Sequence, residues 1–484
     1  MLRARRHGST LAARRARALL AMGIAIATTL GCATGAPPGE EPGAAVVVPS
    51  YRKLRYDEDY SYLKDPSKRS DFWDPIKYIR LNESGDRYLS FGGEGRWRYE
   101  YYRNYQWDPA SPFNGGYLLQ RYLLHADLHV GPRVRLFGQL QASLEDGREG
   151  GPRPTDEDEL DVHQLFTDVR AWTEADDSLL LRVGRQEMLY GSQRLVSVRE
   201  SPNIRRSFDA ARVLGRFGDW HADVFFSKPV ENEPGAFDDG RSDEMFWGVY
   251  TTHPLGCVKG ANADLYFLGL DRPGAEFVQG TGDERRQSLG ARLFGGAGAW
   301  DYNFEGVYQF GSFAGGGIRA WTLATDTGFT LSSVRFAPRL GLKADVISGD
   351  GSAADATLGT FNPLFPRGAY FGEIALIGPE NLIDLHPSIE VHVSEAVTLT
   401  LDCDFFWRYS TGDGIYNNGG GVIRGADGNA RYIGTQPSIG VEWEAGRHTT
   451  FNVVYAHFFA GDYIRESGPG ADVDFLAAWI VYRF

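Results

Sequence analysis

The sequence has no long apolar run, few cysteines and fewer basic than acidic residues. Beyond position 36, no stretch of about 18 or more apolar residues occurs, which excludes a transmembrane helix. Only Cys257 and Cys403 follow that position, too few for a disulfide framework. The net charge is −13, and it falls to −19 without the six arginines among the first 36 residues. This acidic balance argues against a nucleic-acid partner.

Glycine and aromatic residues are abundant instead. The 60 Gly, 24 Tyr, 29 Phe and 11 Trp favour strands and tight turns. Several segments alternate apolar and polar side chains, most clearly residues 300–310 and 397–408. Each is long enough for the roughly 9 to 11 residues that a tilted strand needs to cross a bilayer. Because no helix is available, a closed β-barrel is the only membrane-spanning structure left.

The N-terminal residues 1–36 predict export. Arginines precede an alanine-rich apolar run that ends in small residues, the pattern of a cleaved signal peptide. Thr29 to Cys32 form an imperfect lipobox, because Thr29 stands where such boxes usually carry leucine. We therefore expect ordinary cleavage and treat a lipid anchor on Cys32 as the less favoured alternative.

The C-terminus resembles the last strand of a bacterial outer-membrane barrel. Its apolar side chains alternate up to the final carboxylate, at Leu476, Ala478, Ile480, Tyr482 and Phe484. This resemblance implies outer-membrane lipid as the surroundings and the barrel-assembly machinery as a partner.

Alternating segments recur through the rest of the chain and define an all-β fold. We count 18 between position 88 and the end, about 22 residues each, which predicts an 18-stranded transmembrane antiparallel β-barrel. Short and long connections alternate, so we expect short periplasmic turns and long external loops. Residues 325–334 would make an unusually long periplasmic turn, so 16 strands is the alternative. The predicted organisation is a signal peptide (1–36), an N-terminal periplasmic extension (37–87) and the barrel (88–484).

Residues 181–212 resemble a known family. The stretches 181–187 (Leu-Arg-Val-Gly-Arg-Gln-Glu) and 203–209 (Asn-Ile-Arg-Arg-Ser-Phe-Asp) are similar to the core signature of the alginate-export family of outer-membrane barrels. Residues 360–366, 406–408 and 455–459 extend the similarity. The resemblance implies an 18-stranded barrel whose arginine-lined constriction conducts a polyuronate. It also implies an anionic polysaccharide and periplasmic polysaccharide-export proteins as partners.

The same region is rich in arginine although the whole chain is acidic. A long connection, residues 187–209, can fold into the lumen and narrow it. Guanidinium groups bind carboxylates through paired donors, and rings of cations select anions. The predicted pore residues are Arg182, Arg185, Arg194, Arg199, Arg205, Arg206 and Arg212, with Arg339, Lys343 and Arg408 on the wall. The alternative is that these side chains pair with luminal carboxylates such as Asp168, Asp402 and Asp404 and stiffen the wall.

We therefore expect an anion-selective outer-membrane channel for an acidic polysaccharide or related anion. The alternatives are an uptake porin for small anionic sugars or acids, a barrel enzyme, and a structural barrel. No nucleophile with a base and no paired-carboxylate cluster stands out, so we expect no enzyme and no catalytic residue. We expect no cofactor and no metal site, and we interpret the acidic run 156–161 as the solvated face of an external loop.

Overall fold

The computed structural model describes residues 49–235, 237–238, 243–256, 258 and 260–484. The predicted signal peptide and Cys32 lie outside the described residues. None of the helices in these ranges is long and apolar enough to cross a membrane.

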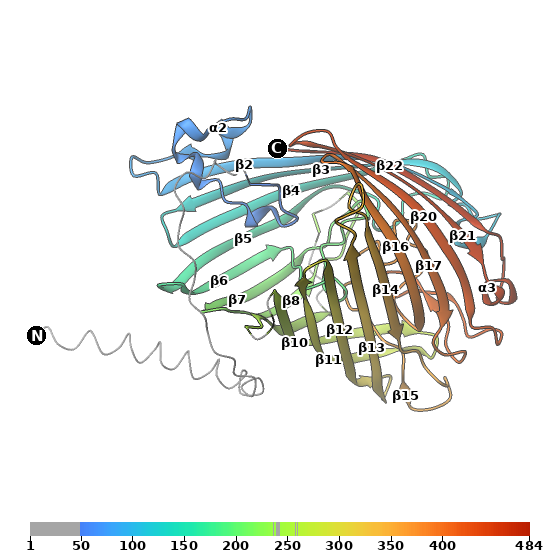
Figure 1. Cartoon of the computed structure of the whole chain (residues 1–484). Helices are drawn as coiled ribbons and strands as arrows, with labels where there is room; N and C mark the ends of the chain where they lie inside the picture. The colour runs from blue at the N-terminus through green and yellow to red at the C-terminus, as the bar shows by residue number, and fades with distance from the viewer. Residues whose placement is uncertain (1–48, 236, 239–242, 257, 259) are drawn as a thin grey trace, which may run out of the picture.

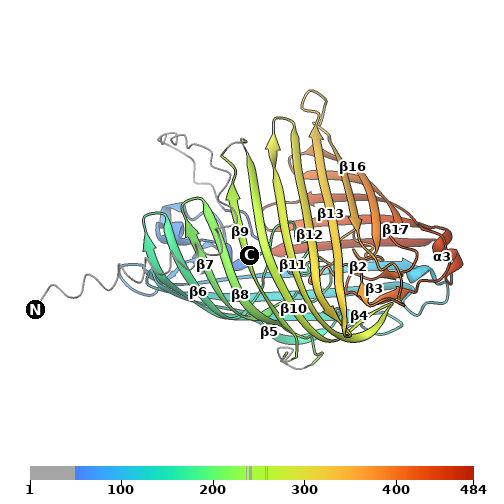
Figure 2. The same ribbon diagram turned by 90° about the horizontal axis from the view of Figure 1, so that it is seen from below.

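Eighteen antiparallel strands close into one barrel, which confirms the predicted fold and strand number. The main sheet has 20 strands, of which the short β1 (Ile79–Arg80) and β15 (Thr357–Leu358) are additions to the barrel. Strands adjacent in sequence lie side by side, and the last strand pairs with the first, from Glu94 with Arg483 to Arg103 with Asp474 (Figures 1 and 2). The barrel strands are β2 (Arg87–Arg103), β3 (Gly115–Val130), β4 (Val134–Asp146), β5 (Asp158–Glu174), β6 (Asp177–Gln186), β7 (Phe208–Phe217), β8 (Trp220–Pro229), β9 (Met245–Pro254), β10 (Ala261–Phe277), β11 (Gly280–Ala297), β12 (Trp300–Phe313), β13 (Gly316–Thr330), β14 (Arg339–Ile347), β16 (Leu382–Ser394), β17 (Val397–Arg408), β20 (Tyr432–Glu444), β21 (Thr449–Ala460) and β22 (Val473–Arg483).

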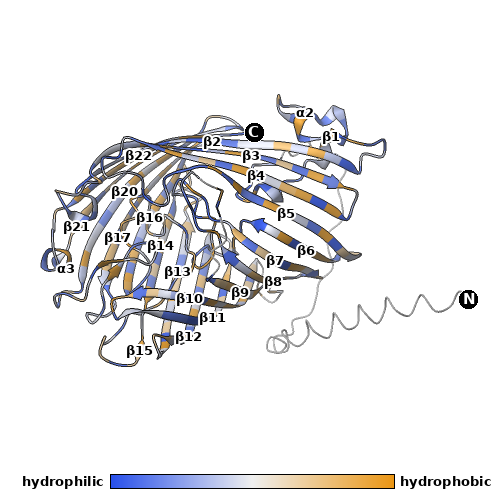
Figure 3. Cartoon of the chain, turned by 180° about the vertical axis from the view of Figure 1, so that it is seen from behind, coloured by the Kyte–Doolittle hydropathy of each residue, from blue (hydrophilic) through white to orange (hydrophobic). Residues whose placement is uncertain are grey.

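The strands carry apolar side chains on the outer face and polar ones inside. In β12, Tyr308 and Phe310 are exposed, whereas Gln309 between them and Glu305 on the same face as Gln309 are buried. The same alternation is visible along most strands in Figure 3. Lipid would cover the outer face, and the inner face is polar, as in membrane barrels.

The two ends of the barrel differ. At the end where the C-terminus lies, here called the turn end, the connections are short (Figure 1). At the opposite end, the loop end, long connections include residues 187–207, 230–244, 348–381 and 409–431. The predicted sorting fails at two places there, because residues 278–279 and 314–315 are two-residue turns. At these two places the strands that the turns connect, β10 to β13, are long and extend where long loops were expected.

A second correction concerns the expected turn at residues 325–334. Strand β13 continues to Thr330 and pairs with β14 as far as Arg339, so the turn is residues 331–338. Thr325 and Thr327 are polar, so the sequence does not mark this end of the strand as apolar. In the structure their hydroxyls donate to the carbonyls of Ala344 and Leu342 on β14.

Short elements cover the turn end and stiffen the long connections. Residues 49–86 pack against the turn end, where Figure 1 shows α2 close to the C-terminus. These elements are η1 (Arg55–Asp57), η2 (Ser61–Lys64), η3 (Pro66–Lys68) and α2 (Asp74–Lys77). The connections at the loop end hold η4 (Tyr105–Trp107), β18 (Ile415–Tyr416), β19 (Val422–Arg424) and α3 (Asp462–Glu466).

Candidate constriction inside the barrel

Two long connections meet inside the barrel and narrow its lumen. They are the 187–207 segment, between β6 and β7, and the 348–381 segment, between β14 and β16. Val196 and Phe365 form a parallel bridge, in which the Ser197 amide donates to the Phe365 carbonyl at 2.9 Å. The Phe365 amide donates to Leu195 at 2.9 Å. The two segments therefore form one unit. This unit packs on the barrel wall where the Phe365 ring contacts the ring of Phe208 on β7.

Arginines of the wall hold the 187–207 segment by its backbone. Arg96 of β2 donates to the carbonyls of Glu200 at 2.8 Å and Pro202 at 2.9 Å. Arg121 of β3 also donates to the Glu200 carbonyl, at 3.1 Å, and Arg96 and Arg121 are both buried. The Asn203 side chain of the segment donates in turn to three carbonyls outside it, on β3, β4 and the neighbouring 147–157 connection. Because the wall arginines satisfy carbonyls of the irregular backbone, the segment can remain inside a barrel.

Most of the predicted pore arginines are paired with carboxylates. Their partners, with N to O distances, are Asp168 for Arg182 (2.7 Å), Asp209 for Arg185 (2.9 Å), Asp345 for Arg194 (2.7 Å), Glu187 for Arg205 (2.7 Å), Asp223 for Arg212 (3.1 Å) and Asp301 for Arg339 (2.9 Å). Arg182, Arg205 and Arg212 are also buried. Pairing of this kind is expected of arginines that stiffen the barrel wall, which is the alternative role given in the sequence analysis.

Arg408 does not fit the predicted pore role. Its side chain has no exposed surface, and its guanidinium lies 3.9 Å from the centre of the Tyr463 ring. It donates to backbone carbonyls of the 409–431 connection, including Ala430 at 2.6 Å and Asp413 at 3.0 Å. Arg408 therefore organises a loop. The expected acidic partners also differ, because Asp402 and Asp404 lie beside His386 instead of an arginine.

Three predicted cations have no carboxylate within ion-pair distance in the described part of the chain: Arg199, Arg206 and Lys343. The Arg199 guanidinium donates to the Ile204 carbonyl at 3.3 Å, and burial lowers the pKa of Arg199 to about 10. Arg206 lies over the Phe365 ring at 5.2 Å and donates to the Pro366 carbonyl. Lys343 lines two cavities of the lumen.

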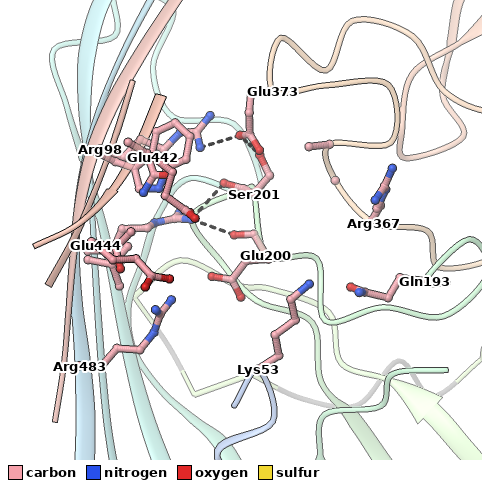
Figure 4. A pocket seen from close by; sticks show the side chains of 17 residues that line it. Lys53, Arg98, Gln193, Glu200, Ser201, Arg367, Glu373, Glu442, Glu444 and Arg483 are labelled. Carbon is pink, nitrogen blue, oxygen red and sulfur yellow. Dashed lines mark hydrogen bonds and ion pairs between the residues drawn. The ribbon is translucent and has the colours of Figure 1, made fainter. Parts of the chain in front are cut away.

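Sequence reasoning missed Arg367, which borders three cavities of the lumen. They have volumes of about 370, 130 and 410 Å³. The Arg367 amide donates to the Gln193 carbonyl at 3.2 Å, and its guanidinium donates to the Tyr370 carbonyl at 3.0 Å. Burial lowers its pKa, and the nearby Arg194 acts in the same direction. In Figure 4, Arg367 extends from the 348–381 segment into the first cavity. The sequence signal that could have indicated Arg367 is the stretch 360–366, which directly precedes it and resembles the family.

The N-terminal extension also reaches this site. Lys53 lines the first cavity, where Figure 4 shows its amine pointing up beside Glu200. Its backbone carbonyl accepts from Arg205 at 2.8 Å. The Tyr56 hydroxyl donates to the Glu187 carbonyl, and its ring packs on the inward-facing Phe137 and Phe166. The position of this part of the N-terminal extension could not be predicted from the period-two pattern, because these residues lie outside the strands.

Acidic and amide side chains share the first cavity with these cations. Glu442 and Glu444 project from β20, opposite Arg367 and Lys53 (Figure 4), and Asn452 of β21 also lines the cavity. The cavity thus offers cations for carboxylates and acceptors for hydroxyl groups, the two functional groups of an acidic sugar.

The model of the alginate export family matches residues 87–477. The chain belongs to this family. None of the curated proteins compared with it matches the chain. Among solved structures, OccK5 (OpdH) of Pseudomonas aeruginosa is 13% identical, with a TM-score of 0.53 over 82% of this chain and 98% of that one. OpdK of P. aeruginosa with vanillate has a TM-score of 0.55 at 10% identity, over 82% and 98%. OccK2 (OpdF) of P. aeruginosa in complex with glucuronate has a TM-score of 0.53 at 10% identity, over 82% and 96%.

These structures are too distant to show more than the fold. Together with the family match, they identify the protein as an outer-membrane channel. The family and the similar barrels are channels and porins, the class that the sequence predicts.

Proposed function

We propose that the barrel conducts an anionic polysaccharide of the polyuronate class through the constriction formed by the 187–207 and 348–381 segments. The observation that carries this proposal is the position of Arg367, which borders three luminal cavities and has no carboxylate in ion-pair distance among the described residues. Membership of the alginate export family supports an acidic polysaccharide as cargo. The OccK2 complex with glucuronate supports a uronate as the unit that such a barrel fold can admit.

The geometry suggests how a polyuronate would pass. Arg367 and Lys53 on one side of the first cavity would bind sugar carboxylates, while Glu442, Glu444 and Asn452 would accept or donate hydrogen bonds at the hydroxyls. Lys343 and Arg339 line the next cavity, so a second uronate could be held before the first is released. Several weak sites in series allow conduction, because no single site traps the polymer. The paired arginines would keep the constriction in shape.

A second candidate is uptake of small anionic sugars or acids. The favouring observation is the size of the cavities, about 370 and 410 Å³, which suit one or two sugar rings better than an open polymer path. The N-terminal extension further reduces the lumen at the turn end through Lys53 and Tyr56.

Single-channel recording in planar bilayers tests both proposals. Arg367→Glu should lower or reverse anion selectivity and reduce block by oligouronates, because it places a carboxylate at the narrowest region. Arg367→Lys should keep the ionic selectivity and weaken block, since it loses the paired donors. Arg285, which is exposed on the same strand face as the lipid-facing Leu289, provides the matched control Arg285→Glu.

The outcomes separate the two cargoes. Block by long oligouronates applied from the turn end supports the polysaccharide conduit. Flux of monomeric uronates without block by longer chains supports uptake of small acids. If Arg367→Glu behaves like Arg285→Glu in both reversal potential and block, the constriction does not select anions through Arg367, and the proposal fails.

A further inference from the structure

Three carboxylates come together at the loop end, and two of them belong to the acidic run that the sequence analysis interprets as solvated. Asp158 is the first residue of β5, Asp161 follows in the same strand, and Asp238 lies in the 230–244 connection. The exposed fractions of these residues are 0, 2 and 5%, so the interpretation as a solvated face is wrong for them. One oxygen from each carboxylate lies within 4.8 Å of the other two.

Hydrogen bonds inside the protein satisfy only part of this group. Asp161 accepts from the Asp238 amide at 3.1 Å and from Arg185 at 3.4 Å. Asp238 accepts from the Glu233 amide at 2.6 Å. Both carboxylate oxygens of Asp158 lack a hydrogen-bond partner in the described part of the chain. A buried carboxylate without a partner is costly, so this arrangement calls for a ligand that donates positive charge.

The balance of charge points the same way. Arg185 is the one cation in ion-pair distance of this group among the described residues, and it also binds Asp209 at 2.9 Å. Three carboxylates facing one shared guanidinium leave an excess negative charge of about two. A divalent cation would remove the repulsion without protonating any of the three groups.

We propose that Asp158, Asp161 and Asp238 bind one calcium ion. Calcium binds oxygen ligands at about 2.3 to 2.6 Å, so two ligands on opposite sides of the ion are about 5 Å apart. The three oxygens are close enough together to contact one such ion at once. Magnesium prefers about 2.0 to 2.1 Å and usually binds through only one or two carboxylates while keeping several waters, so a group of three carboxylates favours calcium. Water and backbone carbonyls would complete the coordination.

The ion would fasten the 230–244 connection to β5. The described contacts between the connection and this side of the barrel include the Asn232 side-chain amide, which donates to the Pro154 carbonyl at 3.4 Å, and the Asp238 amide, which donates to Asp161. Arg185, which shares Asp161, lies at the end of β6 where the 187–207 segment begins. Calcium is therefore placed to fix the loop end next to the constriction.

Calorimetric titration of the purified, chelator-treated full-length barrel with calcium chloride tests this site. We expect saturable binding of one ion, at least about tenfold weaker in Asp158→Asn and in Asp238→Asn, because fewer charged ligands remain. Glu159→Gln is the matched control, since Glu159 is an exposed acid next to Asp158 and should leave the affinity unchanged. Calcium should also protect the 230–244 connection from proteolysis in the wild type and less so in Asp238→Asn.

Folding of each variant is checked by the heat-dependent shift of the barrel on gels. If Asp158→Asn does not fold, Asp238→Asn carries the test, because its side chain lies in a connection outside the strands. Absence of saturable binding by the wild type, or equal binding by Asp238→Asn and Glu159→Gln, would overturn the site. Equal affinity for magnesium would overturn the assignment to calcium.

Discussion

Replacing Arg205 with methionine should loosen the constriction. It should leave the charged residues that line the three cavities unchanged, because Arg205 is not one of them. Arg205 is 3% exposed, and its guanidinium lies 2.7 Å from Glu187 and 3.1 Å from Glu200. It also holds the carbonyl of Lys53 at 2.8 Å. It thus ties the start of the 187–207 segment, the middle of that segment and the N-terminal extension together. Methionine keeps much of the volume and removes all three contacts.

The expected magnitude follows from what remains. Glu187 is buried, and among the described residues its side chain would keep only His163, at 2.8 Å, as a partner. Removing one partner of a buried ion pair costs about 3 to 5 kcal/mol. Glu200 is partly exposed and recovers some hydration, so we expect the lower end, about 3 kcal/mol. Since about 1.4 kcal/mol is a factor of ten, opening of the segment should become roughly a hundredfold more frequent.

Single-channel recording measures this directly, as brief steps to higher conductance that are rare in the wild type. Arg206→Met is the matched control, because Arg206 is the next residue and has no carboxylate in ion-pair distance in the described part of the chain. Heat-dependent gel mobility shows that both variants fold. If Arg205→Met opens no more often than Arg206→Met, Arg205 is not a strut and the energetic reasoning is refuted.

Three further outcomes are expected. Deleting residues 49–57 should raise the mean conductance, because Lys53 and Tyr56 then leave the lumen, and an unchanged conductance would contradict this placement. Deleting Phe484, whose ring stacks on Trp73 at 4.3 Å and whose carbonyl accepts from Arg55 at 2.9 Å, should reduce folded barrel in the outer membrane; normal amounts of heat-modifiable protein would show that these contacts are dispensable. In a background with both Cys257 and Cys403 replaced by serine, a water-soluble thiol reagent should label Thr400→Cys, which faces a luminal cavity, and spare Leu401→Cys, which faces lipid; equal labelling would contradict the assignment of faces.

The strands were predictable because every barrel strand has the same two kinds of surroundings. Lipid on one side and polar groups on the other impose period two along every barrel strand. Residues 397–408 therefore show the bounds of β17 directly. The same rule does not mark where a strand leaves the membrane. Strands β10 to β13 continue beyond it into two-residue turns, which the expectation of long external loops missed.

The constriction was less predictable, because its shape depends on contacts between distant segments. The sequence showed that residues 187–209 are long enough to fold inward. It did not show that residues 348–381 would bridge to them at Phe365, or that Lys53 would enter from the N-terminal side. Such contacts have no period and join positions more than 100 residues apart.

The arginine cluster shows why the count of charges differs from the charge that a cargo meets. Inside a barrel the dielectric constant is low, and an unpaired charge is costly, so most arginines must find a carboxylate nearby. Arg182 with Asp168 and Arg212 with Asp223 follow this rule and contribute little net potential. A cation left without such a partner is costly to the fold, and its cost is relieved when an anion arrives. Arg367, a single arginine outside the cluster, meets this condition better than the paired members of the cluster do.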